Sequence, residues 1–240
     1  MDVVRLKIVF KKENCCLPLN YQSSIQGLIY DSLSKEKEGK FYHEVGYGEN
    51  KLKLFVFSSL IGKKIIDFKN RKIYFEDEFV LYISSEDERF LQILFNYFNV
   101  NKKVVLANQV IDIARVDILS LRSFKGIKEV EIYTLSPIVT YTTENNFVTY
   151  FAPSDDDFEE LVKNNLEKKF DSIGIKKDVN FKITKVISEK SHVVKFKNTT
   201  YKGYTANMIV EVDSPTLSLL YNTGMSSKGS AGFGMIEVKK

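Results

Sequence analysis

The hydrophobic pattern of this chain changes period in a fixed order, and that order constrains the fold more than any other feature. Residues 4–10 alternate between apolar and mostly basic side chains, which is typical of a half-buried strand. Residues 25–33 place apolar side chains three or four positions apart, which is typical of one helix face. Two strand-like stretches follow, then an amphipathic helix over 90–98, then a Val- and Ile-rich stretch over 104–121. This order predicts a ferredoxin-like unit.

Two local patterns predict how elements of this first half begin. The alternation over Lys51–Phe57 predicts a strand with Lys51 and Lys53 on one face and Leu52, Leu54 and Val56 on the other. Ser85 is expected to cap the second helix, because a serine hydroxyl can accept hydrogen bonds from the first free backbone amides.

The second half repeats the same order more loosely. A strand-like stretch over 129–143 contains Pro137, which favours an edge or a break. Ser154 is expected to cap a helix, and two strands follow around a turn near Asn198. A short helix from Ser214, a glycine-rich loop and a final strand complete the order.

The length agrees with two domains, because the chain has 240 residues and a domain commonly has about 100–150. We therefore expect an α+β protein of two tandem ferredoxin-like (RRM-like, βαββαβ) domains, residues 1–125 and residues 126–240. No apolar run reaches the roughly 20 residues that a membrane helix needs, and the charged N-terminal segment does not resemble a signal peptide. A cytoplasmic protein without a membrane partner is expected.

Basic residues are concentrated in two stretches, although the net charge is only +4. Residues 51–72 contain seven Lys and Arg against one acid, and residues 176–204 contain eight Lys against two acids. This segregation suits a polyanionic partner, whereas ordinary solvated strand faces are the alternative that composition alone favours. The two cysteines, Cys15 and Cys16, are adjacent, which disfavours a disulfide, and no residue spacing indicates a metal site.

The loop over residues 224–234 has the most informative composition, with four glycines, three serines and one lysine in eleven residues. Glycines allow backbone amides to approach an anion closely, and Lys228 adds a positive charge. A flexible loop without a ligand is the alternative that the glycine content alone favours.

This loop, with its Gly-Phe-Gly-Met ending, resembles the signature of the CRISPR-associated endoribonucleases that process precursor CRISPR RNA, in the repeat-associated RNA-binding (RAMP) superfamily. The segment LPLNYQSSIQGLIY over 17–30 resembles the first helix of that family, and LSPI over 135–138 resembles the start of its second domain. The three segments occur in the family's order and span nearly the whole chain. Ser226 stands where the family usually has a second glycine, and its hydroxyl can donate to phosphate.

The resemblance implies cleavage inside each CRISPR repeat without metal or cofactor. The ribose 2′-hydroxyl attacks the adjacent phosphate, which leaves a 2′,3′-cyclic phosphate and a 5′-hydroxyl and releases guide RNAs. The resemblance also implies that Tyr30, His43 and Lys53 are catalytic, with His43 protonating the leaving 5′-oxygen. His192 has no counterpart in this pattern. Which of Lys51 and Lys53 lies at the scissile phosphate stays open.

RNA binding is expected from the glycine-rich loop and from basic strand residues: Gly224, Ser226, Lys228, Gly229, Ser230, Gly232, Gly234, Lys51, Lys182, Lys185, Lys195, Lys197 and Lys202. The expected partner is CRISPR repeat RNA, and a CRISPR effector complex or a second copy of the chain are further candidates. A repeat-RNA-binding subunit without catalytic activity, alone or within a larger CRISPR complex, is the alternative function.

Overall fold

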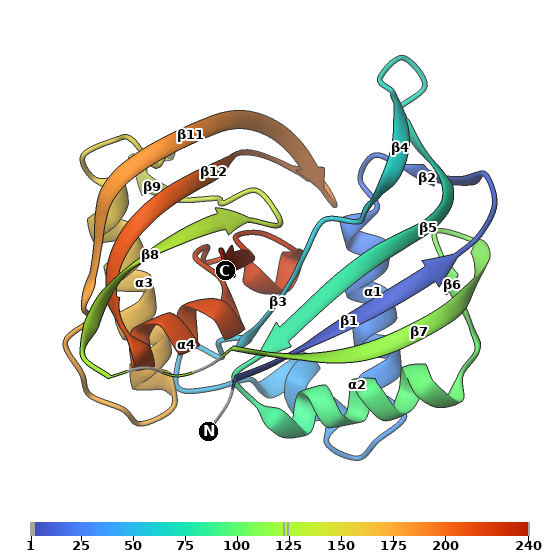
Figure 1. The fold of residues 1–240 in the computed structure, drawn as a ribbon, viewed down its shortest axis with the longest axis horizontal. Helices are drawn as coiled ribbons and strands as arrows, with labels where there is room; N and C mark the ends of the chain where they lie inside the picture. The colour runs from blue at the N-terminus through green and yellow to red at the C-terminus, as the bar shows by residue number, and fades with distance from the viewer. Residues whose placement is uncertain (1–2, 122, 124, 240) are drawn as a thin grey trace.

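The first half of the chain folds into a sheet covered by two helices. The computed structural model describes residues 3–121, 123 and 125–239. The elements of the first half are β1 (Val3–Lys11), β2 (Cys15–Pro18), α1 (Gln22–Leu33), η1 (Phe41–Val45), β3 (Phe55–Phe57), β4 (Ile61–Asp67), β5 (Lys72–Ser85), α2 (Glu88–Val100), β6 (Lys103–Leu106) and β7 (Gln109–Leu121). The sheet has the order β2-β5-β1-β7-β6, and β3 and β4 also pair with β5 (Figure 1).

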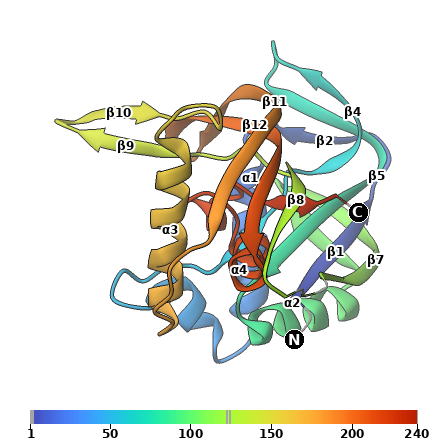
Figure 2. The ribbon, with the colours of Figure 1, turned by 60° about the vertical axis from the view of Figure 1, so that its left-hand side comes forward.

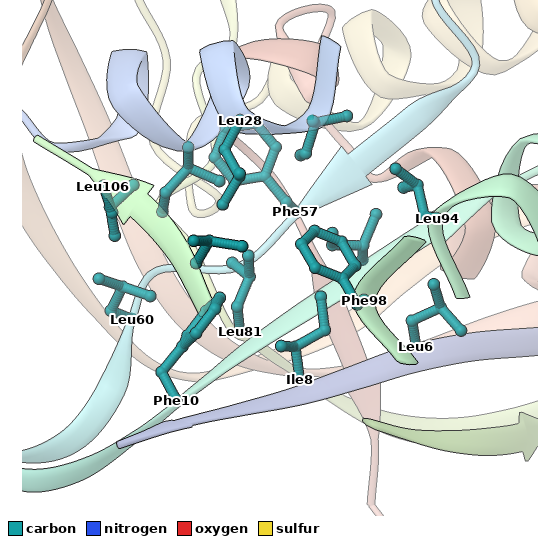
Figure 3. Packing of buried hydrophobic residues seen from close by; sticks show 14 of the residues in the cluster. Leu6, Ile8, Phe10, Leu28, Phe57, Leu60, Leu81, Leu94, Phe98 and Leu106 are labelled. Carbon is teal, nitrogen blue, oxygen red and sulfur yellow. The ribbon is translucent and has the colours of Figure 1, made fainter. Parts of the chain in front are cut away.

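The helices α1 and α2 lie against the same face of this sheet, and the main core fills the space between them. Ile8 and Phe10 of β1 and Leu81 of β5 point into that space, where they meet Leu28 of α1 and Phe98 of α2 (Figure 3). The strand predicted over residues 4–10 and the helix predicted over 25–33 are therefore confirmed. The strand is buried on both faces rather than one, because Arg5 and Val9 are buried as well.

The second half contains a four-stranded sheet and repeats the same topology. Its elements are β8 (Ile127–Thr134), β9 (Tyr141–Glu144), β10 (Phe147–Tyr150), α3 (Phe158–Ser172), β11 (Phe181–Phe196), β12 (Thr199–Asp213), α4 (Ser214–Thr223), η2 (Gly229–Ala231) and β13 (Ile236–Val238). The sheet order is β11-β12-β8-β13, and the β9–β10 hairpin projects away from it (Figure 2). The α+β class with two βαββαβ units is confirmed. No helix in the described part of the chain is long and apolar enough to cross a membrane.

The two halves are joined through a fully buried arginine on β1. The Arg5 guanidinium donates to Ser84 Oγ at 2.7 Å, to Glu237 Oε2 at 2.8 Å, and to the carbonyls of Tyr221 at 3.0 Å and Ile236 at 2.9 Å. It also lies 3.5 Å above the centre of the Tyr221 ring. Burial lowers the pKa of Arg5, while Tyr221 and Glu237 oppose that shift. One side chain of the first half thus holds both α4 and β13 of the second.

The predicted cap of α2 was wrong by two residues. Asp87 is the N-cap, and its carboxylate accepts hydrogen bonds from the amides of Arg89 and Phe90. The Ser85 hydroxyl instead donates to Leu54 O at 2.9 Å and accepts from the Asp87 amide, because Ser85 still belongs to β5. Aspartate also places a negative charge at the positive end of the helix.

The predicted cap of α3 was wrong for a similar reason. Ser154 lies in a turn whose Asp155 side chain accepts from the Ala152 amide, and the Ser154 hydroxyl donates to Glu189 on β11 at 2.8 Å. The helix begins three residues later than expected, after Asp157.

The strand predicted over Lys51–Phe57 is shorter than the alternation suggests. Lys51 has a φ of 51°, and residues Tyr47 and Leu52 bridge a tight turn. Only Phe55–Phe57 forms a strand, and all its side chains are buried. Strand β3 lies between the first half and η2 of the second, so both of its faces are covered and alternation is not required.

Candidate functional site

Tyr30 and His43 come together where α1 ends. The ring centroids are 4.8 Å apart and the rings are perpendicular, so the edge of one meets the face of the other. Tyr30 also contacts the Phe55 ring at 5.8 Å and forms a hydrogen bond with the Ser230 side chain. Burial raises the pKa of Tyr30 to about 12, against the opposing effect of Ser230. The phenol therefore stays protonated near neutral pH and acts as a donor.

His43 is presented to solvent by a single π-helical turn. The turn spans Phe41–Val45 and ends at Gly46, whose amide donates to Phe41 O at 2.8 Å. Gly46 has a φ of 75°, and a Cβ there would lie 2.6 Å from Lys51 O, so this position requires glycine. The Tyr42 side chain points inward while the His43 side chain is exposed. The turn thus offers an accessible imidazole, the usual proton donor or acceptor near neutral pH.

Lys53 lies behind this turn and does not face solvent. Its Nζ is buried and has no hydrogen-bond partner among the described residues. It borders a small enclosed cavity of about 10 Å³ that is also lined by Tyr42, Tyr47 and Ser85. Desolvation lowers the pKa of Lys53, and the nearby charge of Lys51 lowers it further. Lys51 is exposed in its turn, so the two lysines do not share a strand face.

The glycines of the C-terminal loop are buried against the first half. A Cβ on Gly232 would lie 2.3 Å from the Phe57 ring, and one on Gly229 would lie 2.9 Å from Phe55 O. A Cβ on Gly224 would lie 2.9 Å from the Val56 side chain. Close packing against β3 therefore explains these glycines. Gly234 is also tightly packed, against Ser226 within the loop.

Ser226 is buried as well, and its hydroxyl donates to Val139 O at 2.7 Å and accepts from the Lys228 amide. The loop reaches the surface at Ser227, Lys228 and Ser230. Ser230 is the point where the loop meets α1: its carbonyl accepts a 2.7 Å hydrogen bond from Gln26 Nε2. The exposed part of the loop therefore adjoins the Tyr30 site.

Beneath the loop lies a buried lysine that sequence reasoning missed. Lys169 Nζ on α3 donates to the carbonyls of Gly224 at 2.7 Å, Thr223 at 3.3 Å and Ser226 at 3.4 Å. Burial lowers the pKa of Lys169 to about 7. Its donors satisfy carbonyls at the end of α4 that have no partner within the helix.

The basic strand residues are all exposed but form two groups. Lys182 and Lys185 pair with the far end of β12, opposite Glu211 and Ile209. Lys195, Lys197 and Lys202 surround the β11–β12 turn. A separation of 13 residues along one strand, from Lys182 to Lys195, corresponds to roughly 40 Å. The structure does not bring these five lysines together into one face.

A large cleft between the two halves is lined by only one of those lysines. It has a volume of about 540 Å³ and runs between the β4–β5 hairpin and the C-terminal end of β11. Lys64, Arg71 and Lys195 line it, together with the exposed ring of Phe68 and with His192. His192 Nε2 lies 2.8 Å from Thr205 Oγ1. Desolvation lowers the pKa of His192, and the positive charge of Lys190 lowers it further. The cleft residues do not include Tyr30, His43 or Lys53.

Comparison with known proteins identifies the family of this chain. The family model described as "CRISPR associated protein Cas6, C-terminal" matches residues 119–238, half of the chain. The chain belongs to the Cas6 family. It is 27% identical to CRISPR-associated endoribonuclease Cas6 1 of Methanocaldococcus jannaschii, covering 98% of this chain and 92% of that protein. It is 26% identical to CRISPR-associated endoribonuclease Cas6 of Pyrococcus furiosus, covering 93% and 84%.

Two solved structures share this fold over the whole chain. A structure titled "CRISPR associated protein Cas6" aligns with a TM-score of 0.81 at 24% identity, covering 99% of both chains. One titled "An RAMP protein binding different RNA substrates" aligns with a TM-score of 0.79 at 21% identity, covering 100% of both chains. At these identities the likeness establishes the tandem ferredoxin-like fold.

Proposed function

We propose that this Cas6-family protein cleaves CRISPR repeat RNA in precursor transcripts and so releases guide RNAs. The observation that carries the proposal is the contact between Tyr30 and the exposed imidazole of His43, beside the surface of the glycine-rich loop. Family membership and the endoribonuclease names of both curated relatives support the reaction class. The site then needs only to position an RNA strand, because RNA supplies its own nucleophile.

In the proposed reaction the 2′-oxygen attacks the adjacent phosphorus, and the bond from phosphorus to the 5′-oxygen breaks. His43 gives a proton to the leaving 5′-oxygen, and the 2′-hydroxyl proton passes to solvent. Tyr30, held protonated by burial, orients the attacking sugar or a phosphate oxygen by donating a hydrogen bond. The products are a 2′,3′-cyclic phosphate and a 5′-hydroxyl, and no metal takes part.

Lys53 fits this reaction only after a side-chain rotation. Its enclosed Nζ has no hydrogen-bond partner in the described part of the chain. Leaving a buried cation unpaired is costly, so a phosphate at the surface would favour an outward rotamer. In that position Lys53 would neutralise charge that grows on the phosphate. Lys51, already exposed beside it, is the second cation of this region.

RNA binding is proposed at two places. Lys228, Ser230 and neighbouring atoms of the glycine-rich loop would contact phosphates next to the scissile bond. The cleft between the halves would hold a single strand, with Lys64, Arg71 and Lys195 on its phosphates and Phe68 stacked on a base. The buried glycines and Ser226 would shape the loop without touching RNA. An effector complex and a second copy of the chain stay predictions.

The test uses repeat RNA with a single 2′-deoxy nucleotide on the 5′ side of the scissile bond. Purified protein in excess chelator should cut the all-ribose RNA, leave a cyclic phosphate, and fail to cut the deoxy RNA at that bond. Equal binding of both RNAs shows that the nucleophile, and not affinity, was removed. Cleavage of the deoxy RNA, or dependence on divalent metal, would refute the mechanism.

A non-catalytic repeat-binding subunit is the second candidate, and the enclosed position of Lys53 is the observation that favours it. Tight binding of repeat RNA without any cleavage by the wild-type protein would establish this candidate. A Lys53→Ala variant that cuts as fast as wild type would instead show that the site works without this cation.

A further inference from the structure

The placement of His43 depends on its backbone. Among the described residues, no hydrogen bond holds the imidazole, and its ring meets only the ring of Tyr30. The π-helical turn beneath it is a rare conformation that is found mostly at functional sites. Whatever fixes this turn therefore fixes the direction of the imidazole.

A single carboxylate fastens the turn on both sides of His43. Asp87 Oδ2 accepts a hydrogen bond from the Tyr42 hydroxyl at 3.0 Å and a second one from the Tyr47 hydroxyl. Tyr42 immediately precedes His43, and Tyr47 follows the glycine that ends the turn. The two phenols thus converge from either end of the turn on one oxygen atom.

The other oxygen of Asp87 is fixed to a rigid element. Asp87 Oδ1 accepts from the Arg89 amide at 2.8 Å and from the Phe90 amide at 3.3 Å, the first free amides of α2. A carboxylate at the positive end of a helix is also a stabilising placement for the helix. The Phe90 ring also supports Tyr42 edge-on, with centroids 5.2 Å apart. The anchor is therefore the first turn of a helix in the main core.

Both phenols are constant donors to this carboxylate. Burial raises the pKa of Tyr42 and of Tyr47, and the hydrogen bond to Asp87 raises each further. Hydrogen bonds to an ionised acceptor are roughly twice as strong as neutral ones. The Phe41 ring packs against Tyr47 at 5.0 Å and closes the turn from the outside.

We propose that Asp87 is a positioning residue for cleavage, which acts through Tyr42 and Tyr47 to hold His43 against Tyr30. None of the three anchoring side chains needs to touch RNA. The inference rests on the proposed role of His43 as the acid. A displacement of about 1 Å in a reacting group can slow catalysis by about 100-fold, so loss of the anchor should reduce the rate of cleavage more than the affinity.

The decisive variant is Tyr42→Phe combined with Tyr47→Phe, which removes both hydroxyl donors and leaves both rings and the α2 cap. With saturating enzyme, we expect the single-turnover rate constant for repeat RNA to fall by about 10- to 100-fold. We expect the Kd for uncleavable 2′-deoxy repeat RNA to change by less than about twofold. Tyr97→Phe, on the same helix as the anchor, is the matched control and should cut at the wild-type rate.

Asp87→Ser approaches the same interaction from the acceptor side. Serine caps a helix about as well as aspartate, but its short side chain with one oxygen cannot also reach two phenols. We expect the same loss of rate as in the double variant, and no additional loss when the three substitutions are combined. If the double variant fails to fold, the single variant Tyr47→Phe tests the proposal instead. Its single-turnover rate constant should fall by at least about threefold.

Wild-type rates in the folded variants would overturn the role of Asp87, as would a loss of affinity that equals the loss of rate. His43→Ala separates this failure from that of the proposed function. If His43→Ala cuts slowly while the anchor variants cut normally, only the anchor is refuted. If His43→Ala also cuts normally, the assignment of His43 is refuted first, and the anchor with it.

Discussion

The turn that carries His43 and the glycine-rich loop both contact Tyr30, yet they use their backbones in opposite ways. The turn is held from behind by side chains and exposes a titratable group. The loop buries three of its four glycines against β3 and exposes little more than Ser227, Lys228 and Ser230. In the proposed function, the catalytic side chains Tyr30 and His43 therefore come from the first half. The second half supplies a closely packed support with a small cationic surface.

The largest effect on stability is expected from Arg5, which joins the two halves. Arg5→Met removes five donors from a fully buried position and leaves Glu237 and two carbonyls without their partner. We expect the free energy of unfolding to fall by about 3–5 kcal/mol, measured by urea denaturation. Arg115→Met, an exposed arginine on β7, is the control and should change it by less than about 0.5 kcal/mol. A small effect of Arg5→Met would mean that the second half does not depend on this joint.

The two histidines test the division of roles directly. His43→Ala should slow repeat cleavage by at least about 100-fold with saturating enzyme, while the Kd for repeat RNA stays near its wild-type value. His192→Ala removes the other imidazole, which bonds Thr205 in the cleft, and should leave the rate constant of the chemical step unchanged. If both variants lost the same fraction of the cleavage rate, the catalytic role would not be confined to the histidine of the first half.

The order of elements could be predicted from the sequence because burial on one face imposes a period. Residues 4–10 and 25–33 show that period, and the structure has a strand and a helix there. Phe55–Phe57 does not follow this alternation, because segments distant in sequence cover both faces of β3. The predicted cap positions were wrong because the hydroxyls of Ser85 and Ser154 form hydrogen bonds with residues outside the helices that they were expected to cap.

The candidate site was predictable in part, because the family resemblance singled out Tyr30 and His43, whose rings are in contact in the structure. The anchoring residues carry weaker signals. Arg5 sits in the same alternation as Lys7, so the pattern does not distinguish a buried arginine from a solvated lysine. Lys169 follows Leu166 by three positions on the apolar stripe of its helix, and that spacing could have indicated its burial. Asp87 depends on phenols 40 and 45 residues away, which no local pattern reports.

The cationic surface of the loop should have a moderate effect on binding. Lys228→Glu should weaken the binding of repeat RNA by about tenfold near 0.1 M salt. The negative slope of log K against log salt should become shallower by about one, because one phosphate contact is lost. The control is Lys102→Glu, an equal change of charge at an exposed site between α2 and β6. If the two variants weaken binding equally, Lys228 acts through net charge, and the loop does not contact phosphate.

The last effect is expected from Lys169, the lysine beneath the loop, and it concerns the pH dependence of stability. Burial lowers the pKa of Lys169 from its ordinary 10.5 to about 7. Between these pH values the unfolded chain keeps a proton that the folded chain has released, so this residue makes stability rise with pH, by at most about 1.4 kcal/mol per pH unit. Lys169→Met should remove this rise from urea-denaturation measurements between pH 7 and about 9.5. Lys168→Met, at the exposed neighbouring position, should keep it. If the free energy of unfolding varies with pH in the same way for wild type and Lys169→Met, the lysine is charged in the folded protein throughout this range. The loop carbonyls would then accept hydrogen bonds from an ammonium group at every pH tested.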